Sequence, residues 1–173
     1  MEDLRTHGFA PKAPVRYVKE NAIEKRVPKE GDLLVAASGA GPCGRPLWFS
    51  PAIPGIYREP VIYSNFVKRF TTPGPEYAVY LDRILYGKFQ DRTIEDFITG
   101  TSVPNLDAKG LLQSCRIVLP SSHILDIYYR QCLYVFSKLC AAENVVLAGL
   151  RDRLLSGLLS GAIPVPPHKG ATA

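Results

Sequence analysis

Cysteine and histidine are the first residue types to consider for chemistry, because they serve as nucleophiles, bases and metal ligands. The four cysteines, at positions 43, 115, 132 and 140, form no C-x-x-C pair. The three histidines, at positions 7, 123 and 168, make no ligand pattern with them. We therefore expect no metal site. Cys43 lies between Pro42 and Gly44 in a loop-like context, but no histidine has a sequence context that marks it as the base of this thiol.

The glycine-rich run Ser38-Gly39-Ala40-Gly41 is the second candidate, because successive backbone N–H groups can cradle a phosphate. It lacks the Gly-Lys-Ser/Thr of a P-loop and the G-x-G-x-x-G of a dinucleotide fold, so a structural turn is the favoured interpretation. Arg45 follows the run and is a candidate phosphate contact. A methyltransferase motif of the Asn/Asp-Pro-Pro-aromatic type is also missing. We expect no cofactor and no catalysis by this chain itself.

Basic residues recur beside aromatic and polar ones, an arrangement typical of surfaces that hold phosphates and read base edges. They cluster at 16 and 19, at 25, 26 and 29, and at 68 and 69. The predicted DNA-binding residues are Arg16, Lys19, Arg45, Ser64, Asn65, Lys68 and Arg69. The alternative for the basic residues is a solvated face, since Glu20, Glu24 and Glu30 are interleaved with them. For Ser64 and Asn65 the alternative, structural polar groups of a strand, is the favoured interpretation.

The bulk composition agrees with a folded protein that has a polyanionic partner. The 173 residues carry a formal net charge of +5 with 46% hydrophobic residues, which favours a globular core over disorder. The charged start Met1-Glu2-Asp3 does not resemble a signal peptide, and no apolar stretch reaches the length of a membrane span. We expect a cytoplasmic protein with no membrane partner.

The first 120 residues hold nearly all the proline and glycine, with short apolar runs between them. Residues 32–37 predict a buried strand, residues 59–70 have strand-like aromatic and β-branched character, and residues 77–87 predict a short helix. Because prolines interrupt the rest, we predict an α+β fold that is dense in loops.

Residues 121–159 contain no proline and predict one long helix. Apolar residues follow steps of three and four, as in the seam of a coiled coil, and the phase then shifts near position 147. Such a helix would be roughly 50–60 Å long and needs a partner helix. The predicted helix-pairing residues are Leu125, Tyr128, Cys132, Val135, Leu139, Val146, Leu150 and Leu154.

Several ordered motifs resemble the specificity subunits of type I restriction–modification enzymes. Gly100-Thr-Ser-Val-Pro-Asn-Leu-Asp, followed by Ile117-Val-Leu-Pro, is similar to the exit from a target-recognition domain in that family. The run from Leu150 to Ile163 resembles the close of the family's conserved spacer helix. Gly31-Asp-Leu-Leu-Val and Ser64-Asn-Phe-Val-Lys-Arg resemble its central strands. The family's initial strands are not evident before Phe9.

The resemblance implies a function that the residues alone do not. Family members read one half of a bipartite site in double-stranded DNA with each recognition domain. They recruit a methyltransferase subunit, which methylates adenine, and a restriction subunit, which cuts DNA. The implied organisation is a recognition domain at 1–120, a spacer and dimerisation helix at 121–163 and a flexible tail at 164–173. One long C-terminal helix of coiled-coil type would pack against a second helix, either in cis or by forming a homodimer. The alternative is an interaction module that assembles with such subunits without reading DNA.

Overall fold

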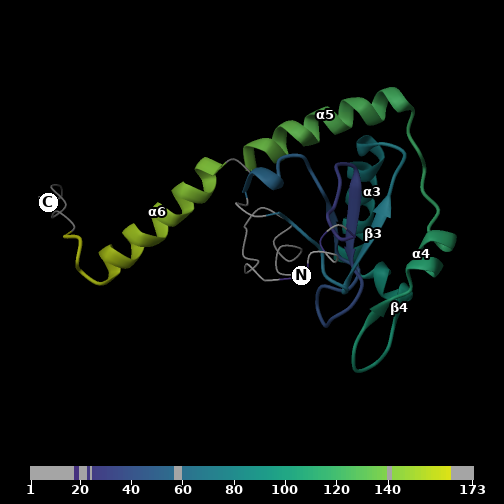
Figure 1. Cartoon of the computed structure of the whole chain (residues 1–173), viewed down its shortest axis with the longest axis horizontal. Helices are drawn as coiled ribbons and strands as arrows, with labels where there is room; N and C mark the ends of the chain where they lie inside the picture. Colours follow the sequence, from purple (N-terminus) through teal and green to yellow (C-terminus); the bar gives the residue numbers. More distant parts are fainter. Residues whose placement is uncertain (1–17, 20–22, 24, 57–59, 140–141, 165–173) are drawn as a thin grey trace, which may run out of the picture. The chain divides into compact units, whose positions relative to one another are not determined.

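The computed structural model describes residues 18–19, 23, 25–56, 60–139 and 142–164. The chain divides into two compact units, residues 1–141 and residues 142–173. The first unit combines helices with small antiparallel sheets, and the second contains a single described helix (Figure 1). The predicted α+β class is therefore confirmed.

The first unit is built on a three-stranded antiparallel sheet with the order β2-β1-β3. The strands are β1 (Asp32–Ala36), β2 (Pro46–Trp48) and β3 (Val67–Thr71). All five residues of β1 are buried, because this central strand is covered on both faces. Leu34 pairs with Leu47 on one side and with Arg69 on the other, which sets the register of the sheet.

The helix α3 (Pro75–Gln90) covers one face of the sheet, where its Leu85 joins Leu33 and Val35 in a buried cluster. Pro75 stands at the first helical position, where a missing N–H costs no hydrogen bond. Loop residues cover the opposite face, since Phe49 and Ile53 pack against Leu34 there. The sheet is thus a layer between one helix and a set of loops.

The helix α5 (Ser122–Leu139) packs against α3 and against the end of β2. Figure 1 shows α5 lying along the edge of the first unit above α3. Trp48 of β2 is fully buried at this junction, beside Ala78 and Val79 of α3. The first unit therefore uses α5 as part of its own core.

Smaller elements complete the first unit, one between β2 and β3 and the others between α3 and α5. They are the 3-10 helices η1 (Pro54–Ile56) and η2 (Thr93–Phe97), the paired strands β4 (Ile98–Thr99) and β5 (Asn105–Leu106), and the helix α4 (Ala108–Ser114). Asp107 caps α4, because its carboxylate accepts a hydrogen bond from the N–H of Gly110 at 2.9 Å. Gly44, before β2, has φ +85°, and a Cβ there would lie 2.6 Å from Cγ1 of Ile94 in η2.

The local predictions meet mixed outcomes. The strand at 32–37 and the helix at 77–87 are confirmed as β1 and as the centre of α3. The strand-like stretch at 59–70 is strand only from Val67, because residues 64–66 form a turn. In place of one helix from 121 to 163 there are α5 and α6 (Ala142–Leu159), with residues 140 and 141 outside the described part. One continuous helix is not shown.

The described part of the second unit consists of α6 and the short turn after it. A turn at Gly161, with φ +76°, follows the helix, as the glycine and proline pattern predicts. Leu147, Leu150 and Leu154 are exposed within this unit. Among the described residues, no helix has both the length and the apolar character that a membrane span requires.

Candidate nucleic-acid interface

Three segments that are distant in sequence meet at the end of β1. The N–H of Ala37 donates to the carbonyl of Phe66 at 2.7 Å, and its carbonyl accepts from the N–H of Leu106 at 2.9 Å. Ser38 forms an isolated bridge with Asn105, and the N–H of Gly39 donates to the carbonyl of Pro104 at 3.2 Å. The loop at 38–44, the turn at 63–66 and the hairpin at 98–106 therefore share this edge, which we call the β1 end.

The turn at 63–66 holds an exposed aromatic ring on a fixed backbone. The Ser64 Oγ accepts from the N–H of Phe66 at 3.3 Å, and its carbonyl accepts from the N–H of Val67 at 3.1 Å. Both the N–H and the carbonyl of Phe66 are thus bonded, while its side chain is 57% exposed. Asn65 is exposed beside it. A ring and an amide face solvent from a well-supported turn.

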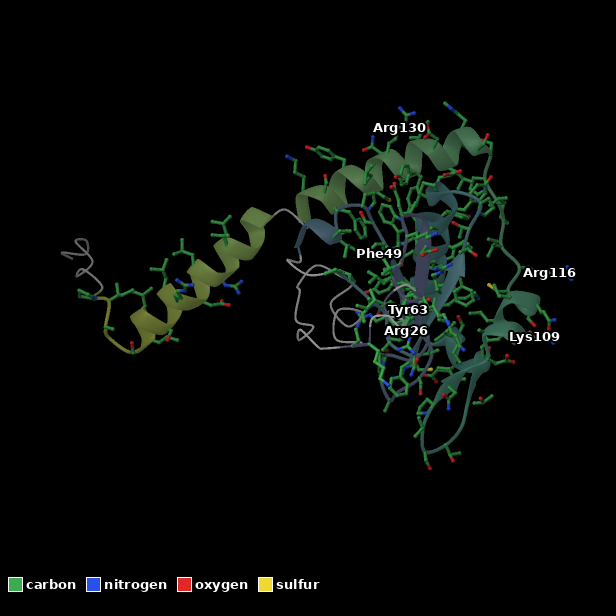
Figure 2. The ribbon with its side chains drawn as sticks, in the orientation of Figure 1. Arg26, Phe49, Tyr63, Lys109, Arg116 and Arg130 are labelled. Atoms are coloured by element: carbon green, nitrogen blue, oxygen red, sulfur yellow. The ribbon has the colours of Figure 1, made fainter. Side chains whose placement is uncertain are left out.

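A basic segment lies against this turn. The Tyr63 N–H donates to the carbonyl of Arg26 at 3.1 Å, and its hydroxyl donates to the carbonyl of Lys25 at 3.3 Å. Figure 2 shows the Arg26 and Tyr63 side chains in the same region of the unit. The segments 25–29 and 60–72 together contain five basic residues, of which Arg69 is paired with Asp32, and Glu30 directly follows the first segment. This excess of positive charge suits phosphate groups.

The predicted DNA-binding residues are only partly brought together here. Ser64, Asn65 and Lys68 lie on or beside the turn, and Lys68 is exposed on β3. Arg69 points to the opposite face of the sheet, because adjacent strand residues alternate, and its Nε lies 3.6 Å from Oδ2 of Asp32. Lys19 is exposed. Arg16 lies outside the described residues.

Arg45 has a structural environment rather than an open one. Its guanidinium carbon lies 5.9 Å from the ring centre of Tyr86 and 5.4 Å from that of Phe89, both on α3. Its Nε is buried with no hydrogen-bond partner among the described residues. A guanidinium over two aromatic faces stabilises the packing of α3 on the sheet. This placement gives no support to the predicted phosphate contact.

The predicted helix-pairing residues separate into two groups. Leu125, Tyr128 and Cys132 of α5 face the body of the first unit, where Leu125 is fully buried and the other two pack against the cluster around Trp48. Burial and a hydrogen bond with Cys132 raise the pKa of Tyr128 to about 12. Three of the predicted seam positions therefore contact a sheet and a helix of the same unit.

The second group is exposed to solvent. Val135 of α5 and, on α6, Val146, Leu150 and Leu154 all show large exposed apolar side chains within their own units. The side chain of Leu139 lies outside the described residues. Val135 in the first unit and these residues of α6 in the second are therefore not covered within their own units.

Cys43 is a buried thiol rather than a reactive one. It packs with Val35 and Ile94 in the core, and burial raises the pKa of its thiol above the usual value. A raised pKa keeps the thiol protonated and weakly nucleophilic. Within the described ranges, no group of three or more histidine, cysteine or acidic side chains is placed to hold a metal ion.

Two features of the candidate interface are not among the DNA-binding residues that the sequence predicts. In the sequence, Phe66 has the pattern of a strand residue. In the structure it lies in the turn at 64–66, and its side chain is therefore exposed. Residues 101–103 at the tip of the β4–β5 hairpin are exposed beside the same edge. Gly100, with φ +90°, is the sequence signal for this hairpin turn.

No model of a known protein family matches this chain, and no curated protein matches its sequence.

Proposed function

We propose that this chain is a DNA-recognition module of a type I restriction–modification specificity subunit. The observation that carries the proposal is the β1 end, where a basic segment, a turn with an exposed ring and amide, and a hairpin tip lie along one edge. Loops presented from a sheet are a usual way to place polar side chains in a DNA groove. The motif resemblance supports the same assignment.

In this proposal, basic and polar residues at the β1 end have different roles. Lys25, Arg26 and Lys68 neutralise phosphates and fix the register of the protein on the duplex. Asn65 reads a base edge, since its amide can bond both N6 and N7 of adenine. Residues 101–103 contact the DNA next to the turn. These assignments use exposed or half-buried side chains only.

In this proposal, α5 and α6 hold the subunits of the enzyme together. We propose that α5 and α6 act as one spacer of coiled-coil type, in which α5 is anchored on the recognition unit and α6 pairs with a second copy. The exposed leucines of α6 and the exposed Val135 support this role. The spacer also provides a docking face for the methyltransferase subunit, and the restriction subunit joins that assembly.

The chain itself is proposed to perform no catalysis. Methyl transfer and cleavage would belong to the partner subunits, and the buried, protonated Cys43 agrees with that division. Because the substrate of such an enzyme is the DNA of the cell, the proposed location is the cytoplasm.

A second candidate function is an interaction module that joins such subunits without reading DNA. The internal contacts of Arg45 and Arg69 favour it, since two of the predicted phosphate contacts are already engaged within the fold. The two functions differ in one measurable property, which is the affinity of the assembly for DNA.

The test combines this chain with methyltransferase subunits of type I enzymes and measures DNA binding and adenine methylation. The proposal expects a complex that methylates adenine at a defined sequence. It also expects a negative slope of log affinity against log salt concentration, of about 0.9 for each phosphate neutralised. A complex that forms but shows no DNA affinity supports the interaction module. A chain that binds none of these subunits contradicts both.

A further inference from the structure

An open extended segment joins α4 to α5. Residues 115–120 run without a turn or bend. The N–H groups of residues 116–119 make no hydrogen bond within the described part of the chain, and the carbonyl of Val118 accepts one from the Tyr80 hydroxyl at 2.7 Å. Backbone groups of a folded chain are normally paired, so this segment has free capacity to pair with another strand.

The side chains of residues 115–118 alternate as in a strand. Cys115 and Ile117 are half-buried against the unit, whereas Arg116 and Val118 face solvent. Val118 is 85% exposed and the next residue, Leu119, is 54% exposed, while Leu112 of α4 is 66% exposed. An exposed apolar patch on an extended segment is typical of a protein-binding site.

An apolar pocket opens beside the segment. It has a volume of about 180 Å³ and lies between the edge strand β3, α3 and the segment itself. Its lining includes Phe70, Leu81, Leu111, Leu112, Cys115 and Ile117. A strand that pairs with residues 116–119 would direct alternate side chains toward this pocket.

The surrounding charge selects the kind of partner. Between Asp107, which caps α4, and Asp126, the chain has two Lys/Arg residues, Lys109 and Arg116, and no acidic residue. Both are exposed, and Figure 2 shows them on the same side of the unit around α4. A second copy of the segment would bring like charges together, whereas acidic side chains would be attracted. The apolar patch and pocket do not suit a nucleic-acid backbone.

We propose that residues 116–119 bind an extended segment of a partner protein by strand addition. The partner segment places one apolar side chain in the pocket and carries carboxylates that face Lys109 and Arg116. Strand addition obtains affinity from backbone hydrogen bonds and specificity from pockets for alternate side chains. This site is separate from the β1 end and does not depend on DNA binding.

The experiment selects a displayed library of short random peptides on the full-length chain, and the enriched peptides are then synthesised. We expect enriched sequences that combine an apolar residue with neighbouring acidic residues. Bound peptide is expected to slow hydrogen exchange of the amides at 116–119. Selection of no sequence, or of sequences without acidic residues, overturns the proposal.

Three variants separate this site from nonspecific binding. Leu112→Glu is expected to weaken the selected peptide about tenfold, since it places a carboxylate at the pocket. Arg116→Glu is expected to weaken it and to improve binding of the same peptide with its acids changed to lysine. Tyr134→Glu is the matched control, because Tyr134 is 63% exposed on α5 and belongs to no proposed binding site, and it is expected to leave binding unchanged.

Other occupants of the segment give different results. Protection of the 116–119 amides that rises with protein concentration, without peptide, indicates a second copy and overturns the proposal. Concentration-independent protection in the free chain indicates that the chain covers its own segment, which also overturns it. The proposal is also overturned if Leu112→Glu and Arg116→Glu leave peptide binding unchanged while their circular dichroism spectra stay normal.

Discussion

The indole ring of Trp48 lies edge-on against the phenyl ring of Phe136, with 5.0 Å between the ring centres and 67° between the planes. Trp48 belongs to the three-residue strand β2, and Phe136 lies near the end of α5. Tyr129 makes a second edge contact with the same indole at 5.8 Å. The buried Trp48 therefore attaches α5 to the sheet at two points along the helix, Tyr129 and Phe136.

The first prediction tests this contact by truncating Phe136. Phe136→Ala is expected to lower the free energy of unfolding of the first unit by about 2–3 kcal/mol, because a partly buried ring and its edge contact are lost. Chemical denaturation followed by circular dichroism measures the change. Tyr134→Ala is the control, because Tyr134 is 63% exposed on the same helix. We expect it to change stability by less than about 0.5 kcal/mol. Equal effects of the two variants would contradict the anchoring of α5.

The second prediction compares the neighbours Lys68 and Arg69, which lie on opposite faces of β3. Lys68→Ala is expected to weaken DNA binding and to reduce the salt slope by about 1, as loss of one phosphate contact should. Arg69→Ala is expected to leave the slope unchanged and to lower stability by about 1 kcal/mol through its ion pair with Asp32. DNA-binding titrations over a range of salt concentrations, with thermal unfolding of both variants, make the comparison. The reverse pattern would move the proposed DNA surface to the other face of the sheet.

The sequence predicts the central elements of this fold from local patterns. The apolar run at 32–37 after Gly31 becomes the buried strand β1, and the spacing of apolar residues at 77–87 becomes α3. The strand is predicted by a short continuous apolar run and the helix by apolar residues at helical spacing, so neither prediction needs knowledge of distant contacts.

The sequence predicts that α5 pairs with a partner helix, but a local pattern does not contain the identity of the covering surface. Leu125, Tyr128 and Cys132 have coiled-coil spacing, but such a stripe specifies only that one face of the helix is buried. The covering surface is Trp48 with Val79, which are distant in sequence. Similarly, the sequence predicts Lys68 and Arg69 together as DNA-binding residues, although strand geometry directs their side chains to opposite faces of the sheet. Arg45 could not be recognised as internal, because its aromatic partners lie on α3.

The third prediction concerns alkaline pH. Burial raises the pKa of Tyr128 and of Tyr129 to about 12, with a hydrogen bond from Tyr129 to Glu30 adding to the effect in the second case. In the unfolded chain these phenols ionise near pH 10, so the unfolded state binds fewer protons between pH 10 and 12. Their contribution to stability is therefore complete below pH 10 and is lost as the pH rises to 12.

Denaturation midpoints measured between pH 9 and 12 test this sign. The double variant Tyr128→Phe, Tyr129→Phe is expected to lose less stability over that interval than the unmodified chain. Tyr134→Phe is the control and is expected to retain the full alkaline decrease. A decrease that is identical in all three proteins would show that the two buried phenols do not contribute.

The fourth prediction concerns thiol reactivity. Cys43 is buried with a raised thiol pKa, so it is expected to react with iodoacetamide far more slowly than Cys115 in the folded chain at pH 8. Cys115 is only half-buried and therefore provides the internal comparison. Mass spectrometry of digested protein after timed labelling measures both sites, and labelling in denaturant should equalise them. Rapid labelling of Cys43 in the folded chain would reopen the possibility of a catalytic thiol.

The fifth prediction addresses the exposed leucines of α6. Leu147, Leu150 and Leu154 follow steps of three and four, so they lie along one stripe of the helix. Leu150→Asp with Leu154→Asp is expected to reduce self-association at least about tenfold, because two leucines that pack at the pairing surface would be replaced by carboxylates. Sedimentation equilibrium of the full chain measures the change. Ser156→Asp adds one charge to a polar position of α6 and is expected to leave self-association nearly unchanged. If the unmodified chain stays monomeric at high concentration, pairing of α6 with a second copy is wrong. The stripe would then be left to a helix of another subunit.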